Sequence, residues 1–162
     1  MSSILGISGG FIPRAQNSAA CLIINGKLEF AQEEERINRI KNSRGLMPTN
    51  AIKEALNFKK LKINNIDFVA YSSKNLKLIN KIKSYFNFTF GYCPKIIPID
   101  HHTCHAYSAF YPSGFTKANI ITADFSGDGV STTINLGDKN GIKRIKEFKK
   151  PNSLGIFYGL IT

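Results

Sequence analysis

The segment 19–32 reads AACLIINGKLEFAQ and encodes two strands joined by a tight turn. Asn25 and Gly26 supply the positive φ angles of a two-residue hairpin turn, for which this dipeptide is strongly preferred. The residues before the turn are apolar, and those after it alternate between apolar and polar, as half-buried strands do. An apolar run at Ser3–Ser8 predicts one more strand upstream, so we expect the chain to open with three antiparallel strands.

Helical and strand patterns alternate after this hairpin. The predicted elements are a helix over 50–58 that begins after Pro48 and Thr49, a strand over 66–71, a helix over 76–86 and a strand over 95–99. A charged stretch, 33–44, separates them from the hairpin. The predicted order is therefore βββαβαβ, which is typical of an α/β fold.

The opening pattern starts again at residue 118. Strands predicted at 119–124, 130–136 and 142–148 are joined by glycine-containing turns, and an apolar helix over 154–161 follows a cap at Pro151–Ser153. This duplicated plan is that of the actin-like ATPase (ribonuclease H-like) scaffold. We expect a duplicated βββαβα unit with a first half at 1–117 and a second half at 118–162, where the second unit is truncated.

Glycine turns at corresponding places in the two halves are candidate nucleotide-binding sites. In actin-like ATPases the phosphates lie between two such turns, where backbone N–H groups can hold oxyanions. The candidate residues are Ser8, Gly9, Gly127, Asp128 and Gly129.

The composition favours a cytoplasmic protein with a small-molecule substrate. Lys and Arg number 22 against 11 Asp and Glu, which gives a formal charge of +11. The lysines are scattered, as on an ordinary solvated surface, so we do not expect a nucleic-acid partner, although a phosphate-bearing substrate would profit from the positive field. The three cysteines form neither a disulfide framework nor a CxxC motif, and neither a signal peptide nor a membrane span of roughly 20 apolar residues is predicted.

All three histidines of the chain fall within HHTCH, at His101, His102 and His105, directly after a potential helix cap at Asp100. If a helix begins there, His101 and His105 lie one turn apart on the same face and can share a metal ion, whereas His102 points elsewhere. The ordinary alternative for such a pair is that both are histidines of a helix surface or core.

Asp124 strengthens the metal interpretation because it ends an apolar strand and enters a glycine turn, where carboxylates often reach a ligand. Two imidazoles and a carboxylate make an open site that suits Fe²⁺, Mn²⁺ or Zn²⁺.

The stretch 101–115, HHTCHAYSAFYPSGF, closely resembles the HHxxHAxSAFYPSGF signature of the nodulation-protein and antibiotic O-carbamoyltransferases. Further segments resemble the same family in the same order: 4–8, 18–22, the EEERINRIK stretch 33–41, the DFSGDG stretch 124–129, and 153–158. The resemblance thus extends over almost the whole chain.

This resemblance implies an ATP- and metal-dependent transfer of a carbamoyl group from carbamoyl phosphate, through a carbamoyl-adenylate, to a hydroxyl of a sugar or another small acceptor. It implies a metal, with Fe²⁺ favoured, held by His101, His105, Asp124 and a further carboxylate from outside this chain. It also implies that Asp128 with Gly127 and Gly129 lies against nucleotide phosphates or their metal.

Four residues are candidates for catalytic or anion-binding roles. Many family members carry a His-Asp pair where this chain has Gln16 and Asn17, neither of which can act as a general base near pH 7, so the base stays unassigned. Arg36 and Lys41 are candidates for holding anionic substrate groups, with a solvated charged loop as an equal alternative.

Other interpretations stay open at this point. Family members continue for several hundred residues, so we expect the 162-residue chain to be inactive alone and to need a C-terminal half from the same gene or a separate chain. A noncatalytic subunit of a split protein is one alternative, and a tRNA threonylcarbamoyl-transfer protein is another. An oligomer is compatible with the sequence.

Overall fold

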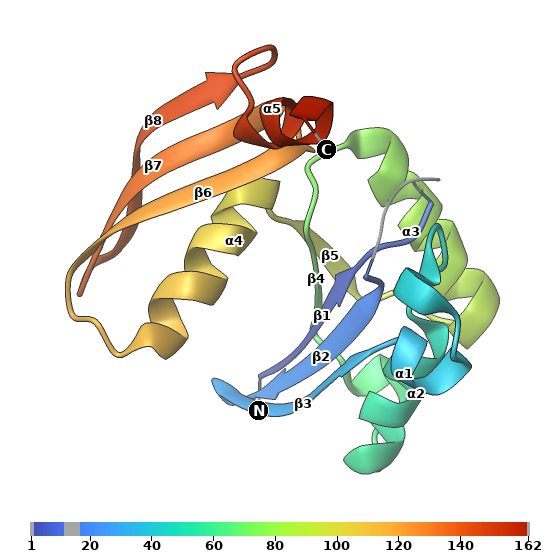
Figure 1. Ribbon diagram of the computed structural model, residues 1–162. Coiled ribbons are helices and arrows are strands. Elements are labelled where there is room, and N and C mark those ends of the chain that lie inside the picture. The colour runs from blue at the N-terminus through green and yellow to red at the C-terminus, as the bar shows by residue number, and fades with distance from the viewer. Residues whose placement is uncertain (1, 12–16, 162) are drawn as a thin grey trace. The chain divides into compact units, whose positions relative to one another are not determined.

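Five strands form the sheet of the first of two compact units, Met1–Pro98 and Ile99–Thr162 (Figure 1). The structure is a computed structural model that describes residues 2–11 and 17–161. The strands are β1 (Ser3–Ser8), β2 (Ala19–Ile24), β3 (Lys27–Glu33), β4 (Phe68–Tyr71) and β5 (Lys95–Pro98), in the order β3-β2-β1-β4-β5. The first three are antiparallel, and β4 and β5 run parallel to β1, which confirms the predicted order of elements.

The hairpin between β2 and β3 forms as its sequence predicts. Asn25 has a φ of 50° and Gly26 a φ of 80°, the left-handed pair that a two-residue turn requires. The register shifts opposite Leu22 and Ile23, where Glu29 of β3 has no partner in β2, which marks a β-bulge in β3. The turn therefore sets the pairing that the apolar alternation of the strands needs.

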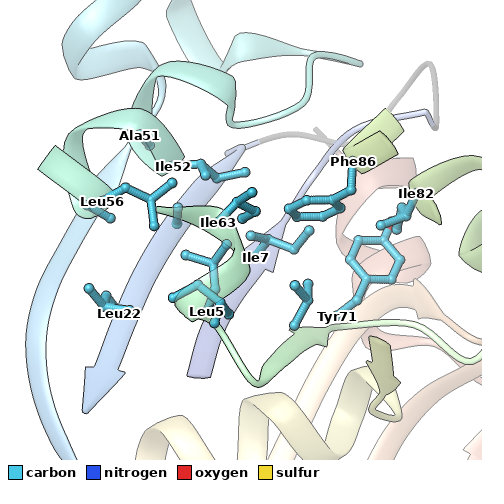
Figure 2. Packing of buried hydrophobic residues seen from close by; sticks show 14 of the residues in the cluster. Leu5, Ile7, Leu22, Ala51, Ile52, Leu56, Ile63, Tyr71, Ile82 and Phe86 are labelled. Carbon is cyan, nitrogen blue, oxygen red and sulfur yellow. The ribbon is translucent and has the colours of Figure 1, made fainter. Parts of the chain in front are cut away.

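The core of this unit lies between one face of the sheet and two helices, α2 (Thr49–Phe58) and α3 (Leu76–Phe90) (Figure 2). Side chains from β1, β2 and β4 interdigitate with apolar residues of both helices; the fully buried ones include Leu5, Leu22, Val69, Ile52, Ile82 and Phe86. Burying a side chain of this kind stabilises the fold by about 1.5–3 kcal/mol. A short helix α1 (Glu35–Asn38) and 3-10 turns η1 (Lys41–Ser43) and η2 (Ile63–Asn65) complete the unit.

Helix α3 continues to Phe90, four residues beyond the predicted end at 86. It ends at Gly91, whose φ of 72° provides the left-handed cap that stops many helices. The extra turn is held by aromatic packing, because the rings of Tyr85, Phe86 and Phe90 lie within 6.0 Å of one another, centroid to centroid. Contacts between aromatic rings within the helix therefore override the poor helix propensity of the segment.

The second unit is a three-stranded antiparallel meander with two helices. Its elements are α4 (His101–Phe110), the 3-10 turn η3 (Tyr111–Ser113), β6 (Ala118–Gly127), β7 (Val130–Asp138), β8 (Gly141–Lys149) and α5 (Leu154–Ile161). Helix α4 packs through buried Ala106 and Phe110 against Ile120 of β6. By packing, α4 belongs with the strands that follow it. The predicted halves 1–117 and 118–162 were defined by the sequence repeat and not by packing, so they stay a prediction.

Helix α5 begins at Leu154 because Ser153 caps it. The Ser153 hydroxyl accepts a hydrogen bond of 3.1 Å from the N–H of Ile156, and it lies 3.0 Å from the carbonyl oxygens of Asp124 and Phe125. The predicted cap is therefore present, and it also fixes α5 to the end of β6. No helix in the described part of the chain has both the length and the apolar character needed to cross a bilayer.

Candidate metal centre

Asp100 starts the helix that carries the histidines. Its carboxylate accepts hydrogen bonds of 2.9 Å from the backbone N–H and the hydroxyl of Thr103, which is the geometry of an N-cap. Arg144, from β8, donates from its guanidinium to the same carboxylate and, at 3.2 Å, to Thr103 Oγ1. The start of α4 is thus fixed both by a local cap and by a contact from the neighbouring sheet.

Three predicted ligands meet at one point in this unit. Nε2 of His101 lies 2.7 Å from Oδ2 of Asp124 and 3.0 Å from Nε2 of His105. Nε2 of His105 lies 3.7 Å from the same Asp124 oxygen, which closes the triangle. Helical spacing brings the two imidazoles together, and the packing of α4 on β6 brings them to the carboxylate.

This triangle has the size that a transition-metal ion requires. Ligand atoms about 2.1 Å from one ion lie roughly 3.0 Å apart at octahedral angles and roughly 3.4 Å apart at tetrahedral angles. The three edges, 2.7, 3.0 and 3.7 Å, bracket these values. Two unprotonated imidazole nitrogens repel at 3.0 Å, so a cation or proton between them is the natural partner of this arrangement. The donor set therefore fits a divalent metal.

The electrostatics of the site favour the metal-binding protonation states. Burial lowers the pKa of His105, the electrostatic interaction with the neighbouring His101 adds to this, and Asp124 opposes it. For Asp124, burial would raise the pKa, but the hydrogen bonds from His101 and from the N–H of Phe125 hold it below its usual range. Both shifts favour a neutral imidazole and an ionised carboxylate, which are the forms that bind metals.

Gly127 makes room for the His101 ring. A Cβ atom at position 127 would lie 1.9 Å from Cδ2 of His101, far inside van der Waals contact. The absence of a side chain at the end of β6 is therefore a requirement for the imidazole to reach Asp124. In the sequence, this glycine was predicted only as part of a phosphate-binding turn.

The two turns predicted to bind nucleotide contain residues with positive φ angles. Gly9, which follows Ser8, has a φ of 85°, and between β6 and β7 Asp128 and Gly129 have φ values of 49° and 85°. The carboxylate of Asp128 accepts a hydrogen bond of 3.2 Å from the backbone N–H of His101, so this turn borders the histidine cluster. Ser8 donates its hydroxyl proton to the carbonyl of Asn17 at 3.1 Å, within the first unit.

The catalytic candidates are more scattered. Gln16 lies outside the described residues, and the N–H of Asn17 donates to the carbonyl of Asn42 at 2.8 Å. Arg36 pairs with Glu33 at 3.2 Å and Lys41 with Glu35 at 3.4 Å, and both cationic side chains are exposed. Anion binding by Arg36 and Lys41 stays a prediction.

Sequence reasoning missed the residues that support the histidines. Arg144 carried no signal, because nothing in a single sequence connects β8 to a helix that begins 44 positions earlier. His102 was predicted only to point away from the metal, and it does: its side chain is fully buried between α4 and the sheet. A signal for His102 existed in the threonines of 132–133 and Thr122, which are unusual in the middle of apolar strands.

The chain is similar to proteins of known families. Residues 87–162 match the family described as carbamoyltransferase N-terminus. A nodulation protein, NolNO of Sinorhizobium fredii, is 30% identical over 188 residues, which cover 95% of this chain and 28% of that protein. An uncharacterized protein of Methanocaldococcus jannaschii is 33% identical over 161 residues, 98% of this chain and 29% of the relative. The chain thus spans less than a third of the length of these relatives.

Solved structures support the fold. YeaZ from Pseudomonas aeruginosa superposes with a TM-score of 0.60 at 9% identity, over 93% of this chain and 68% of that one. At this identity the likeness concerns the fold alone, and it is the predicted actin-like scaffold. Residues 87–162 thus match the carbamoyltransferase N-terminus family, and the chain is similar along nearly its whole length to part of a nodulation protein.

Proposed function

We propose that this chain is the N-terminal portion of an ATP- and metal-dependent O-carbamoyltransferase. In the proposed reaction water first releases inorganic phosphate from carbamoyl phosphate. An oxygen of the resulting carbamate then attacks the α-phosphorus of ATP, so that a carbamoyl-adenylate forms and pyrophosphate leaves. A hydroxyl oxygen of a sugar or another small acceptor then forms the new bond to the carbamoyl carbon, and AMP leaves. The family match over 87–162 supports the reaction class, and the acceptor is the least constrained part of the proposal.

The observation that carries the proposal is the triangle of His101, His105 and Asp124 at 2.7, 3.0 and 3.7 Å. These residues would hold a divalent metal, for which Fe²⁺ is our first choice and Mn²⁺ and Zn²⁺ the alternatives. A metal held there would supply Lewis acidity toward phosphate or carbamoyl oxygens. The side chains of His101 and Asp124 are 29% and 34% exposed, which leaves part of the site open to substrate.

The protein's own contribution is to orient the ligands and the phosphates. The N-cap at Asp100, held by Arg144, fixes the start of the helix, and Gly127 leaves the space that the His101 ring occupies. We propose that the backbone N–H groups around Gly127–Gly129 and Ser8–Gly9 bind nucleotide phosphates. Gly9, Asp128 and Gly129 have the positive φ angles of tight turns, and backbone N–H groups in turns can bind anions.

The test is carbamoyl transfer in the longest natural form of the protein. Radiolabelled carbamoyl phosphate and ATP are supplied with a panel of sugars, and both labelled carbamate ester and AMP are measured. The variants His101→Ala and Asp124→Asn should lose at least about 100-fold in rate, in line with the loss of an essential metal ligand. Full activity of both variants would rule out the metal role.

A matched control comes from the same helix. Ser108 makes one hydrogen bond, 2.9 Å to the carbonyl of His105, and its side chain is exposed, so Ser108→Ala should keep both metal content and rate. Metal content is measured by elemental analysis in parallel with activity. If the parent protein bound metal but transferred no carbamoyl group, the proposed metal site would stand and the proposed reaction would be refuted.

A further inference from the structure

His102 lies at one end of a buried chain of hydrogen bonds in the second unit. Its Nδ1 is 2.7 Å from Thr122 Oγ1, which is 2.7 Å from Thr133 Oγ1, which accepts from Asn135 Nδ2 at 2.7 Å. Its Nε2 is 3.0 Å from the carbonyl oxygen of Val130. All four side chains are buried, with exposures between 0% and 5%. The proposed metal chemistry uses none of them.

The groups at the two ends of this hydrogen-bond chain determine which atom donates in each of its hydrogen bonds. The Val130 carbonyl can only accept, so Nε2 of His102 carries a proton. In the tautomer with its single proton there, Nδ1 accepts from the Thr122 hydroxyl. At the other end the Asn135 amide can only donate through Nδ2, so the Thr133 hydroxyl gives its proton to Thr122. One consistent pattern results, with the imidazole in a single tautomer.

This chain of hydrogen bonds joins α4, which carries the metal ligands, to β6, to β7 and to the turn between them. Val130 directly follows the turn at Asp128 and Gly129, and the N–H of His101 donates to the Asp128 carboxylate at 3.2 Å. The first two residues of α4 are therefore each bonded to the β6–β7 turn region. Thr122 lies two residues before Asp124 on β6, and side chains two apart on a strand face the same side.

We infer that His102, Thr122, Thr133 and Asn135 form a positioning device for the metal centre. The inference rests on the proposed metal role of the neighbouring residues. In an α-helix the direction of His102 around the axis fixes the directions of His101 and His105, since all three belong to one rigid turn. Pinning the buried ring to Thr122 and Val130 therefore sets the rotation at which the two ligands face Asp124.

Polar side chains at these positions fix the rotation of α4 better than apolar ones would. Apolar side chains at these positions would pack in several rotations of the helix, because the hydrophobic effect has no direction. A buried ring whose two nitrogens each need one specific partner accepts a single rotation, since any other leaves a buried polar atom without a hydrogen bond. In the described residues, every fully buried side-chain nitrogen and oxygen has such a partner.

The test compares two substitutions of Thr122. Thr122→Val keeps the shape but removes the hydroxyl that donates to Nδ1, and Thr122→Ser keeps the hydroxyl. Co²⁺ is titrated into the chain and its visible absorption bands are recorded. We expect Thr122→Val to weaken Co²⁺ binding by about tenfold or more and to change the band pattern, as is typical when supporting partners of metal ligands are lost. Thr122→Ser should bind within about twofold of the parent.

The substitution one link further away guards against a variant that fails to fold. Thr133→Val breaks the same chain without touching His102, and Thr133→Ser restores it, so the same contrast with a smaller amplitude is expected. Unfolding in urea is measured for each. If folded Thr122→Val and Thr133→Val bind Co²⁺ as tightly as the parent, with the same absorption bands, the positioning role is refuted.

A second readout does not need the metal. Long-range ¹H–¹⁵N correlation spectra report which ring nitrogen of His102 carries the proton. The inference requires the Nε2–H tautomer in the parent and in Thr122→Ser, and a mixture of states in Thr122→Val; the Nδ1–H tautomer in the parent would overturn it. If the parent bound no Co²⁺ yet showed the Nε2–H tautomer, the proposed metal function would fail while the hydrogen-bond chain stood.

Discussion

Nε2 of His101 lies 2.7 Å from Oδ2 of Asp124, although 23 positions separate the two residues in the chain. Their meeting depends on a helix and a strand that pack together, on a glycine that leaves space, and on contacts that hold the helix start. Each of these supports can be removed singly.

Gly127→Ala should weaken metal binding without unfolding the chain. The new Cβ would lie 1.9 Å from the His101 ring, so the imidazole must leave its place beside Asp124. We expect at least a tenfold weaker Co²⁺ affinity, on the order of the effect of losing a ligand's support. The matched control is Gly159→Ala, which adds a Cβ that meets no atom within 4 Å. Equal affinities in the two variants would contradict the structure.

Ser153→Ala should loosen α5 from β6. The hydroxyl accepts from Ile156 and lies against the carbonyls of Asp124 and Phe125, so its loss removes both a helix cap and a contact with the strand. We expect a loss of about 1–2 kcal/mol in the free energy of unfolding measured in urea. Ser84→Ala, which removes one exposed bond to the Asn80 carbonyl, should change it by less than about 0.5 kcal/mol.

Glu34→Gln should destabilise the first unit. This buried carboxylate accepts from the N–H of Ala51 at 2.9 Å and from the side-chain amide of Asn50 at 2.7 Å, so it caps helix α2 from outside the helix. A glutamine can offer one oxygen, and its amide group would face another donor. We expect a loss of about 1–3 kcal/mol. Glu54→Gln, on the exposed face of α2, is the control and should behave like the parent.

The stability of the first unit should depend on pH through Asp67. The backbone N–H and hydroxyl of Ser3 donate to its carboxylate at 2.8 and 3.0 Å, and these bonds hold the pKa of Asp67 below its usual range. A depressed folded pKa means a contribution that is present above the unfolded pKa of about 3.9 and lost as the pH falls through the folded value.

The measurement for Asp67 is the difference in unfolding free energy between the parent and Asp67→Asn, taken in urea at several pH values. The difference should be largest near neutral pH and should shrink as the pH falls below about 4. A difference that stays constant across this range would show that the ionised carboxylate adds nothing to stability.

Local patterns made most of the fold predictable. The hairpin at Asn25 and Gly26, the cap at Asp100 and the cap at Ser153 all depend on residues within four positions of one another, and all are present. The end of α3 was wrong by four residues because ring packing among Tyr85, Phe86 and Phe90 decides it, and such packing is invisible to propensity.

The candidate site was predictable in its ligands and not in its supports. Helical spacing alone predicts that His101 and His105 share a face. Asp124 was recognised as the end of a predicted strand, although β6 continues three residues further, to Gly127. Arg144 and the chain from His102 to Asn135 depend on how two strands align beside a helix, which one sequence does not specify. Glu34, which lies in a stretch that looked like a charged loop, is buried for the same reason.

Isothermal titration of the chain with Fe²⁺ under anaerobic conditions, with Mn²⁺ and Zn²⁺ in parallel, tests the central claim most directly. We expect one ion per chain, with His101→Ala, His105→Ala and Asp124→Asn each weakening binding by about tenfold or more, since each removes one corner of the triangle. Replacing His102 by Gln should weaken binding less than removing a corner. Binding of no ion, or binding that all three corner substitutions leave unchanged, would contradict a metal centre at this position.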